Sequence, residues 1–458
     1  MSATAKLLKD LGWEVGGSDE ECYPPASDYL ISQKIPFVTG YDAKNIPANA
    51  DIIVIGRNAK LSPETNEEVR AAIESGKTIK SFPEVLGEIT KDKENIVVAG
   101  SYGKSTCTAL FAWCLMNAGK DPGYFIGAIP VQFEESSRIG KSKIFILEGD
   151  EYPTSHTDPR PKFAHLHPQS VLLTSADHDH VNVYPILESY LKPFEDLLKK
   201  NNGLIAAGID NPHVSELIAP YPNRAITYGL SGRARWSAQN IKFGETTAFK
   251  LTKDSEVVIN LETKLLGRHN VENIVGVSAL ILEKGLLTKE ELAAGVKTFL
   301  GIKRRLDLKT EKSSILIYEG FGSSYEKARS AIEAIKLHFP DRRLVILFEP
   351  HTFSWRNRAA ITWYDSVFEG ADKVFIGSPA EQGAQTHDQL SQEEIVERAR
   401  RAGVSAEPLG NQKDALSEIR KNIKPENVLL ILTSGNLGGL IQPLIKMAEE
   451  NFPIPTPN

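Results

Sequence analysis

A strand, a glycine-flanked loop and a helix follow one another between Ile96 and Asn117, and this order constrains the fold more than any other feature. The strand Ile96–Ala99 is apolar and β-branched. Backbone N–H groups and a helix N-terminus attract phosphate, a lysine adds a full positive charge, and a serine hydroxyl can ligate Mg²⁺. The segment therefore predicts an α/β fold with a site for the triphosphate of ATP. The loop residues are Gly100, Ser101, Tyr102, Gly103, Lys104, Ser105 and Thr106.

A chain of 458 residues with a formal net charge of −6 has room for about three domains. The negative charge and the lack of a polybasic block argue against binding to nucleic acid or to a membrane surface. The three cysteines form no disulfide or metal-binding pattern, no apolar run reaches membrane-spanning length, and no signal peptide is evident. We expect a cytoplasmic protein with small-molecule partners, either a monomer or a weak dimer.

Alternating strand and helix patterns predict three α/β domains. Residues 1–89 read as a small Rossmann-like domain, and residues 90–305 as a central domain with a parallel sheet plus a small antiparallel sheet. Residues 306–458 read as a second doubly wound domain. In the first domain, residues 51–56 predict a buried parallel strand. Ser18 and Asp19 end another strand, where an acidic residue commonly binds a ribose, although Asp19 is equally a turn cap.

Two strand ends of the central domain carry charged side chains. The first ends in Glu148, Asp150 and Glu151, of which Glu151 is the first choice as a Mg²⁺ ligand. The second ends in Asp177-His-Asp-His180, where Asp177 and His180 could hold a second cation or orient a phosphate. Solvated caps and turns remain the alternative for both groups.

Two further motifs could contact a nucleotide. His269, Asn270 and Asn273 fall on the first turn of a predicted helix, where they could bind adenine or simply cap the helix. Arg304 and Arg305 close the central domain, and their guanidinium groups suit a γ-phosphate.

Taken in order, these motifs resemble those of the Mur ligases over nearly the whole chain. The matches are Gly100–Thr106, Asp150-Glu151, Asp179-His180, the His269–Asn273 element and Arg304-Arg305. The resemblance implies a UDP-sugar domain, a central ATPase domain and a Rossmann-like domain that presents an amine. It also implies ATP and Mg²⁺ as cofactors.

The resemblance implies a mechanism through an acyl phosphate. The lactyl carboxylate of UDP-N-acetylmuramate attacks the γ-phosphate of ATP, and an amine then displaces phosphate. Lys104, Glu151, His180 and Arg305 would be catalytic, and Mg²⁺ would be held by Ser105, Glu151 and His180.

Finer features resemble the family branch that attaches murein tripeptide in peptidoglycan recycling. Phe194 occupies the position that other branches give to a carbamylated lysine, which resembles both the alanine-adding branch and this one. Asp150-Glu-Tyr152 and an insertion with Arg160 and Lys162 also match this branch, and these two cations would bind the acceptor. The alanine-adding branch of peptidoglycan synthesis is the alternative.

Two departures from the family pattern make a non-catalytic nucleotide-binding paralogue a further alternative. Family members open with a strand and a glycine-rich loop that binds pyrophosphate, and Met1 aligns with the end of that loop. We expect a native start about 15 residues earlier, and otherwise weak UDP-sugar binding and an easily unfolded first domain. In the third domain, Gly320, Ser323 and Ser324 replace an acid and two histidines. The loss predicts a high KM for ATP, and Glu319 could partly substitute for the acid.

Overall fold

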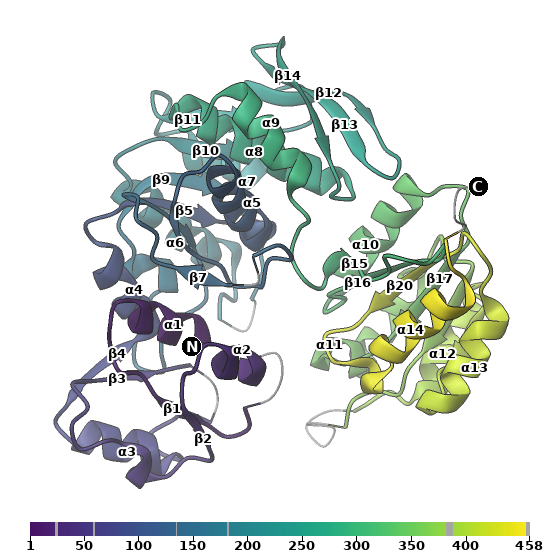
Figure 1. The fold of residues 1–458 in the computed structure, drawn as a ribbon, viewed down its shortest axis with the longest axis horizontal. Helices are drawn as coiled ribbons and strands as arrows, with labels where there is room; N and C mark the ends of the chain where they lie inside the picture. Colours follow the sequence, from purple (N-terminus) through teal and green to yellow (C-terminus); the bar gives the residue numbers. More distant parts are fainter. Residues whose placement is uncertain (23–25, 58–59, 134, 181–182, 382–387, 455–458) are drawn as a thin grey trace. The chain divides into compact units, whose positions relative to one another are not determined.

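The computed structural model describes residues 1–22, 26–57, 60–133, 135–180, 183–381 and 388–454, traced in Figure 1. Within these ranges, no helix has the length and apolar character needed to cross a membrane. The described residues divide into two compact units. The first comprises Met1–Asn240, Phe249–Leu261 and Glu272–Phe299, and the second comprises Ile241–Ala248, Glu262–Val271 and Leu300–Asn458. The predicted N-terminal domain and most of the predicted central domain thus lie in the first unit.

The N-terminal part of the first unit contains two small parallel sheets, β1–β2 and β3–β4. Its elements are α1 (Ser2–Asp10), β1 (Gly17–Asp19), α2 (Ala26–Ser32), β2 (Phe37–Thr39), η1 (Ala43–Asn45), β3 (Ile52–Ile55), α3 (Glu67–Glu74), β4 (Thr78–Ser81) and α4 (Phe82–Thr90). The parallel strand predicted over residues 51–56 is confirmed as β3, but its predicted burial is wrong. All of β3 is only half-buried, because its sheet has a single partner strand.

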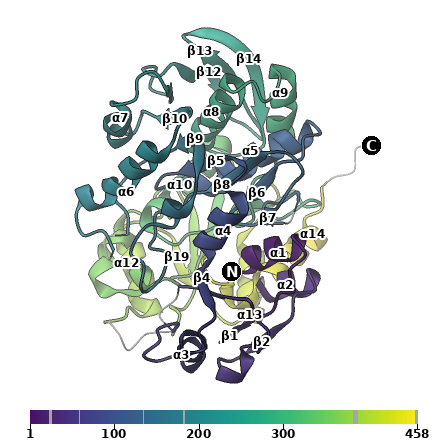
Figure 2. The same cartoon turned by 90° about the vertical axis from the view of Figure 1, so that its left-hand side faces the viewer.

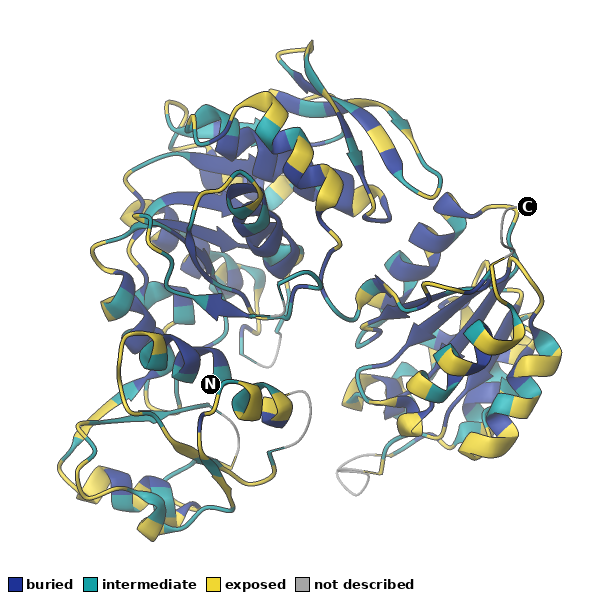
Figure 3. Ribbon diagram, in the orientation of Figure 1, coloured by how far each residue is buried: buried dark blue, intermediate teal, exposed yellow. Residues whose placement is uncertain are grey.

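We expect the backbone amides of β1 to β4 to exchange with solvent deuterium well before those of the central sheet. Two-stranded sheets are marginally stable, and Figure 3 shows these strands mostly as half-buried or exposed. Native-state exchange followed by mass spectrometry measures the difference. Equal protection of β3 and the buried central strand β5 (Glu94–Ala99) would contradict this expectation.

The centre of the first unit is built on a ten-stranded sheet with the order β14-β13-β12-β11-β10-β9-β5-β8-β6-β7. Figure 2 shows β9, β5, β8 and β6 side by side, and these strands are parallel. The further strands are β6 (Gly123–Phe125), β7 (Ser137–Arg138), β8 (Ile144–Glu148), β9 (Pro168–Leu173), β10 (Ile205–Gly208), β11 (Ala225–Tyr228), β12 (Trp236–Lys242), β13 (Thr247–Lys253) and β14 (Glu256–Thr263). The short connections among β12, β13 and β14 require antiparallel neighbours, as the sequence predicts.

Helices cover this sheet, and one of them begins at the phosphate loop. They are α5 (Lys104–Asn117), η2 (Lys162–His165), α6 (Leu187–Lys200), α7 (Pro212–Ile218), α8 (Arg268–Glu283) and α9 (Lys289–Thr298). Most side chains of α5 are buried, because the helix follows the central strand β5 and packs on both β5 and β8. This position brings the N-terminus of α5 to the carboxyl edge of the sheet.

The second unit has a six-stranded sheet with the order β15-β16-β20-β17-β18-β19. β15 is antiparallel to β16, and the other pairs are parallel. Its elements are β15 (Arg305–Leu308), β16 (Leu316–Gly320), α10 (Tyr325–His338), β17 (Leu344–Phe348), α11 (Phe353–Arg356), η3 (Arg358–Asp365), β18 (Lys373–Ile376), α12 (Gln392–Arg401), β19 (Ala406–Pro408), α13 (Gln412–Asn422), β20 (Val428–Leu432), η5 (Leu437–Gly439) and α14 (Ile441–Asn451). The predicted doubly wound α/β architecture is confirmed.

Candidate active site

The phosphate loop depends on two glycines with left-handed backbone. Gly100 has φ +134° and Gly103 has φ +81°. A Cβ on Gly100 would lie 2.2 Å from Thr174 Oγ1, and one on Gly103 would lie 2.6 Å from Asn273 Oδ1. The loop backbone therefore approaches the ends of β9 and α8 more closely than any side chain at these two positions permits.

The segment after β9 fixes the loop from the other side. Ser101 donates its N–H to the Ser175 carbonyl at 3.1 Å and its hydroxyl to the Asp177 carbonyl at 2.7 Å. Tyr190 OH lies 2.8 Å from the same Ser101 hydroxyl. The Tyr102 N–H donates to Ser175 Oγ at 3.1 Å. Sequence reasoning missed Tyr190, which carries no motif and whose role depends on where α6 packs.

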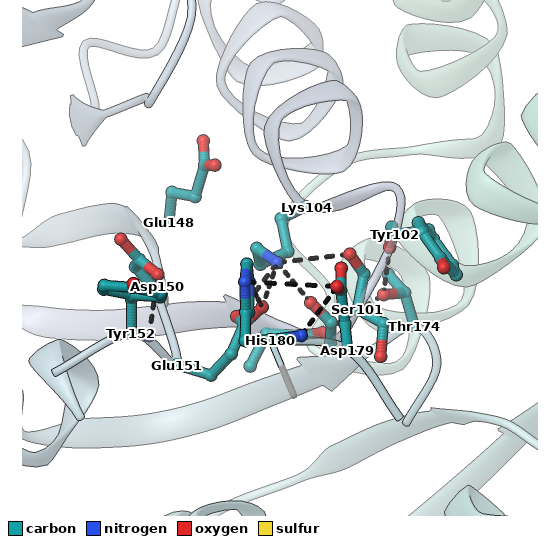
Figure 4. Close-up of polar contacts among 12 residues, drawn as sticks. Ser101, Tyr102, Lys104, Glu148, Asp150, Glu151, Tyr152, Thr174, Asp179 and His180 are labelled. Atoms are coloured by element: carbon teal, nitrogen blue, oxygen red, sulfur yellow. Dashed lines mark hydrogen bonds and ion pairs between the residues drawn. The ribbon is translucent and has the colours of Figure 1, made fainter. Parts of the chain in front are cut away.

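Lys104 lies at the centre of the site, between the loop and Glu151 (Figure 4). Its Nζ is 2.9 Å from Glu151 Oε2 and donates to the Ser101 carbonyl at 3.4 Å. Glu151 is only 1% exposed, so its negative charge depends on the lysine for compensation. The arrangement holds an ammonium beside the loop that would cradle a phosphate.

His180 approaches the other side of Glu151. Its Nε2 is 3.3 Å from Glu151 Oε1, and the hydrogen bond to this carboxylate raises the pKa of the imidazole. His180 has φ +55°, and its N–H donates to Asp179 Oδ1 at 2.7 Å. The structure thus brings together Lys104, Glu151 and His180 from α5 and from the ends of β8 and β9.

The other acids of this strand end have separate partners. Glu148 accepts hydrogen bonds from Ser105 Oγ at 2.8 Å and from the Gly127 N–H at 2.6 Å. Asp150 pairs with Lys162 Nζ at 2.5 Å. Among the residues that the structure describes, no group of three or more His, Cys, Asp or Glu side chains is arranged to hold a metal ion. Ser105 and Glu148 nevertheless offer oxygen donors of the type that Mg²⁺ prefers.

The predicted adenine motif is divided between the two units. Asn273 belongs to the first unit and lies beside Gly103. His269 and Asn270 belong to the second unit. There His269 Nδ1 is 3.4 Å from Ser330 Oγ, and the Asn270 amide donates to the Leu266 carbonyl at 2.8 Å. A nucleotide-binding role for these three side chains stays a prediction.

Arg304 contacts other residues of the second unit. Its Nε donates to Glu319 Oε1 at 3.0 Å, and its Nη2 donates to the Gly435 carbonyl at 2.6 Å. Glu319 is buried and also pairs with Lys309 at 2.8 Å. Glu319 therefore has two cationic partners and is poorly placed to replace a ribose-binding acid. Arg305 is exposed at the start of β15.

The three residues of the departure in the third domain have structural roles here. Ser324 caps α10 by accepting the Lys327 N–H at 3.4 Å, and Ser323 Oγ accepts from Lys327 Nζ at 3.2 Å. A Cβ on Gly320 would lie 3.2 Å from Leu432 Cδ2. An aspartate at position 320 would thus require Leu432 to move.

The predicted acceptor and sugar residues are also paired. Arg160 donates to Asp158 through Nε and Nη2 at 2.9 and 2.8 Å, which lowers the pKa of that carboxyl to about 2. In the N-terminal part, Ser18 donates to Glu68, and Asp19 accepts from Tyr41 OH at 3.2 Å. These contacts leave the predicted binding roles untested.

Glu272, in the N-terminal half of α8, predicts a pH-dependent stability. Burial raises its pKa to about 7, and the carboxylates of Asp210 and Asp177 add to the shift. The unfolded chain releases this proton more readily, so the free energy of unfolding falls as pH rises from about 4.5 toward 7. We expect Glu272→Gln to stabilise the protein at pH 8 by about 1–3 kcal/mol and to have little effect near pH 4.5.

Thermal unfolding of both proteins across this pH range tests the expectation. Glu256→Gln is the matched control, because Glu256 is an exposed carboxyl on β14 of the same unit. If the stability of Glu272→Gln and of the unmutated protein changed with pH in the same way, the raised pKa of Glu272 would be contradicted.

Comparison with known proteins gives consistent matches along the chain. The family described as Mur ligase middle domain matches residues 98–281, and the Mur ligase family, catalytic domain, matches residues 1–94. UDP-N-acetylmuramate–L-alanine ligase of Solidesulfovibrio magneticus is 31% identical over 381 residues, covering 82% of this chain and 80% of that protein.

Two further comparisons cover almost the whole chain. UDP-N-acetylmuramate–L-alanyl-γ-D-glutamyl-meso-2,6-diaminoheptandioate ligase of Escherichia coli K12 is 26% identical over 453 residues, covering 97% of this chain and 95% of that protein. The crystal structure of UDP-N-acetylmuramate–alanine ligase MurC from Thermotoga maritima aligns with a TM-score of 0.81 at 21% identity, covering 98% and 96% of the two chains. This last likeness concerns the fold.

Proposed function

Because the chain belongs to the Mur ligase family, we propose that it joins murein tripeptide to UDP-N-acetylmuramate in peptidoglycan recycling. The enzyme is an ATP-dependent ligase of peptidoglycan synthesis that forms amide bonds. The proposed acceptor is L-alanyl-γ-D-glutamyl-meso-diaminopimelate, and the proposed donor group is the lactyl carboxylate of the sugar. The product is an amide between that carboxyl and the alanine amine.

The observation that carries the proposal is the position of Lys104 between the phosphate loop and the buried Glu151. Phosphoryl transfer builds charge on the phosphate oxygens, and preset cations stabilise that charge. The Lys104 ammonium and the N–H groups at the start of α5 would face these oxygens. His180 would hold Glu151 from the opposite side.

Mg²⁺ fits the oxygen donors near this lysine. Ser105 Oγ and Glu148 Oε1 are 2.8 Å apart, and the Glu151 carboxylate lies beside Lys104. We propose that Ser105, Glu151 and His180 would hold the ion, with Glu148 orienting the serine hydroxyl. When bound, Mg²⁺ would supply positive charge to the transferring phosphoryl group.

Two features support the tripeptide as acceptor. The strand end continues from Glu151 into Tyr152, and the following insertion carries Arg160 and Lys162. One relative that spans nearly the whole chain is named for this tripeptide. Phe194, at the position where other branches have a carbamylated lysine, fits both the tripeptide-adding and the alanine-adding branch; it is fully buried and packs against Tyr190 at a centroid distance of 5.4 Å.

The alternative acceptor is free L-alanine, as in the name of the 31% identical relative. The decisive experiment offers the protein UDP-N-acetylmuramate, ATP, Mg²⁺ and a panel of amino acids and peptides. Mass spectrometry then identifies the product. We expect the tripeptide conjugate, whereas an alanine conjugate alone would place the protein in the alanine-adding branch. No conjugate at saturating ATP would favour the non-catalytic alternative. Gly320 in place of an acid also suggests that alternative, because the neighbouring Glu319 is already paired with Arg304.

Arg160→Met and Lys162→Met are expected to raise the KM for tripeptide about threefold to tenfold while changing that for ATP less. Each variant removes a cation that could pair with an acceptor carboxylate. Steady-state kinetics with each substrate varied in turn measures the difference. Arg235→Met is the control, because Arg235 forms a similar surface pair with Asp254 at 3.1 Å. Equal changes in both KM values would reject an acceptor-binding role.

A further inference from the structure

Tyr152 lies where the N-terminal part of the first unit meets the candidate active site. Its ring is 5.0 Å from the His180 ring between centroids, and the planes meet at 82°. Figure 4 shows Tyr152 beside His180 and next to Glu151 in the chain. Within the family motifs Tyr152 only distinguishes the branch, and it has no role in the phosphoryl transfer proposed above.

Cations approach Tyr152 from two other elements. The Arg57 guanidinium carbon, just after β3, is 4.8 Å from the ring centroid. Arg57 Nη1 also donates to the Pro153 carbonyl at 3.4 Å. Lys162 Nζ, in the insertion, is 5.6 Å from the same centroid. Tyr152 is therefore held between a cation of the N-terminal part and the catalytic histidine.

We propose that Tyr152 is a positioning residue for His180 and that Arg57 fixes Tyr152 in place. The proposal rests on the proposed ligase function. His180 has a left-handed backbone, which costs energy in a residue other than glycine and persists where surrounding contacts enforce it. An edge-to-face aromatic contact supplies such a constraint, and a guanidinium over the ring adds attraction at its face.

The consequence is a link between the N-terminal part and the phosphoryl site. Arg57 is contributed by residues 1–89, whereas His180 follows β9. A loss of the Arg57 contact would loosen Tyr152 and, through it, the approach of His180 to Glu151. The effect would fall on the rate of the chemical step, since neither Arg57 nor Tyr152 belongs to the phosphate loop.

The test compares ring-preserving and ring-removing variants in the full chain. We expect Tyr152→Leu to lower kcat about tenfold, the scale of one aromatic pair, with the KM for ATP changed less than twofold. Tyr152→Phe keeps the ring and should retain most of kcat. Arg57→Met should lower kcat about threefold to tenfold in the unmutated background but have little effect in Tyr152→Leu. Arg70→Met, an exposed arginine on α3, is the control.

A second measurement separates positioning from general damage. In protein with labelled histidine, the ring-proton resonances of His180 should shift in Arg57→Met, which keeps the Tyr152 ring and its ring current, but remain near their original positions in Tyr152→Phe. An active unmutated protein whose Tyr152→Leu variant keeps its kcat, or whose Arg57→Met variant keeps its His180 resonances, would overturn this inference alone. An unmutated protein that ligates no acceptor would overturn the proposed function and this inference with it.

Discussion

Lys104→Ala is expected to lower ligation at least about a thousandfold, the largest effect of any single substitution proposed for this protein. The lysine provides the ammonium between the loop carbonyl of Ser101 and Glu151. Without it, the charge on the transferring phosphoryl oxygens loses its nearest cation. Product formation measured by mass spectrometry, with ATP saturating, gives the rate.

A control variant must distinguish a loss of catalysis in Lys104→Ala from a loss of folding stability. Lys104→Ala leaves Glu151, at 1% exposure, without its ammonium partner, and an unpaired buried charge is destabilising. The double variant Lys104→Ala, Glu151→Gln removes that charge and should recover thermal stability without recovering ligation. Near-normal ligation by a folded Lys104→Ala protein would remove Lys104 from the active site.

Gly100→Ala is expected to be the most disruptive of the small substitutions. Its Cβ would fall 2.2 Å from Thr174 Oγ1 and 2.7 Å from the Ser175 carbonyl oxygen, at a φ of +134°. The loop or the end of β9 must move, so we expect a loss of several kcal/mol in unfolding free energy. ATP turnover should also fall at least about a hundredfold. Chemical denaturation and ATP turnover measure the two effects.

Gly119→Ala is the matched control for the backbone. Gly119 also has a positive φ, +73°, but a Cβ there meets nothing within 4 Å. It should therefore show only the cost of the left-handed conformation, about 1 kcal/mol. Similar losses in the two variants would mean that the close approach of Thr174 to the loop does not matter.

The α/β fold and the position of the phosphate loop could be predicted because their signals are local. An apolar β-branched run, two glycines and a lysine specify strand, loop and helix within about 20 residues. The meeting of Glu151 and His180 follows from a general rule of parallel sheets. Strands β8 and β9 flank β5, so their carboxyl ends share one edge.

The contacts of the hinge arginines could not be predicted in the same way. The guanidinium fork of Arg304 and its place in the hinge motif predict a γ-phosphate ligand, and that role stays a prediction; in the structure Arg304 bonds to Glu319, which lies across the β15–β16 pair. A motif records which groups can pair, whereas tertiary packing decides which of them do. The prediction that β3 is buried is wrong because tertiary structure, too, decides how much of a strand is covered. An apolar run indicates a strand, but the number of neighbouring strands determines how much of it is covered.

The hydrogen bonds between the phosphate loop and the segment after β9 have a thermodynamic consequence. Ser175 and Asp177 fix the loop backbone, and His180 lies three residues further along the same segment. The loop and the histidine therefore lie on one interconnected piece of backbone. Little conformational entropy would remain to be lost when a triphosphate enters. Nucleotide binding to the first unit would then have a smaller entropic cost, because the loop is already ordered during folding.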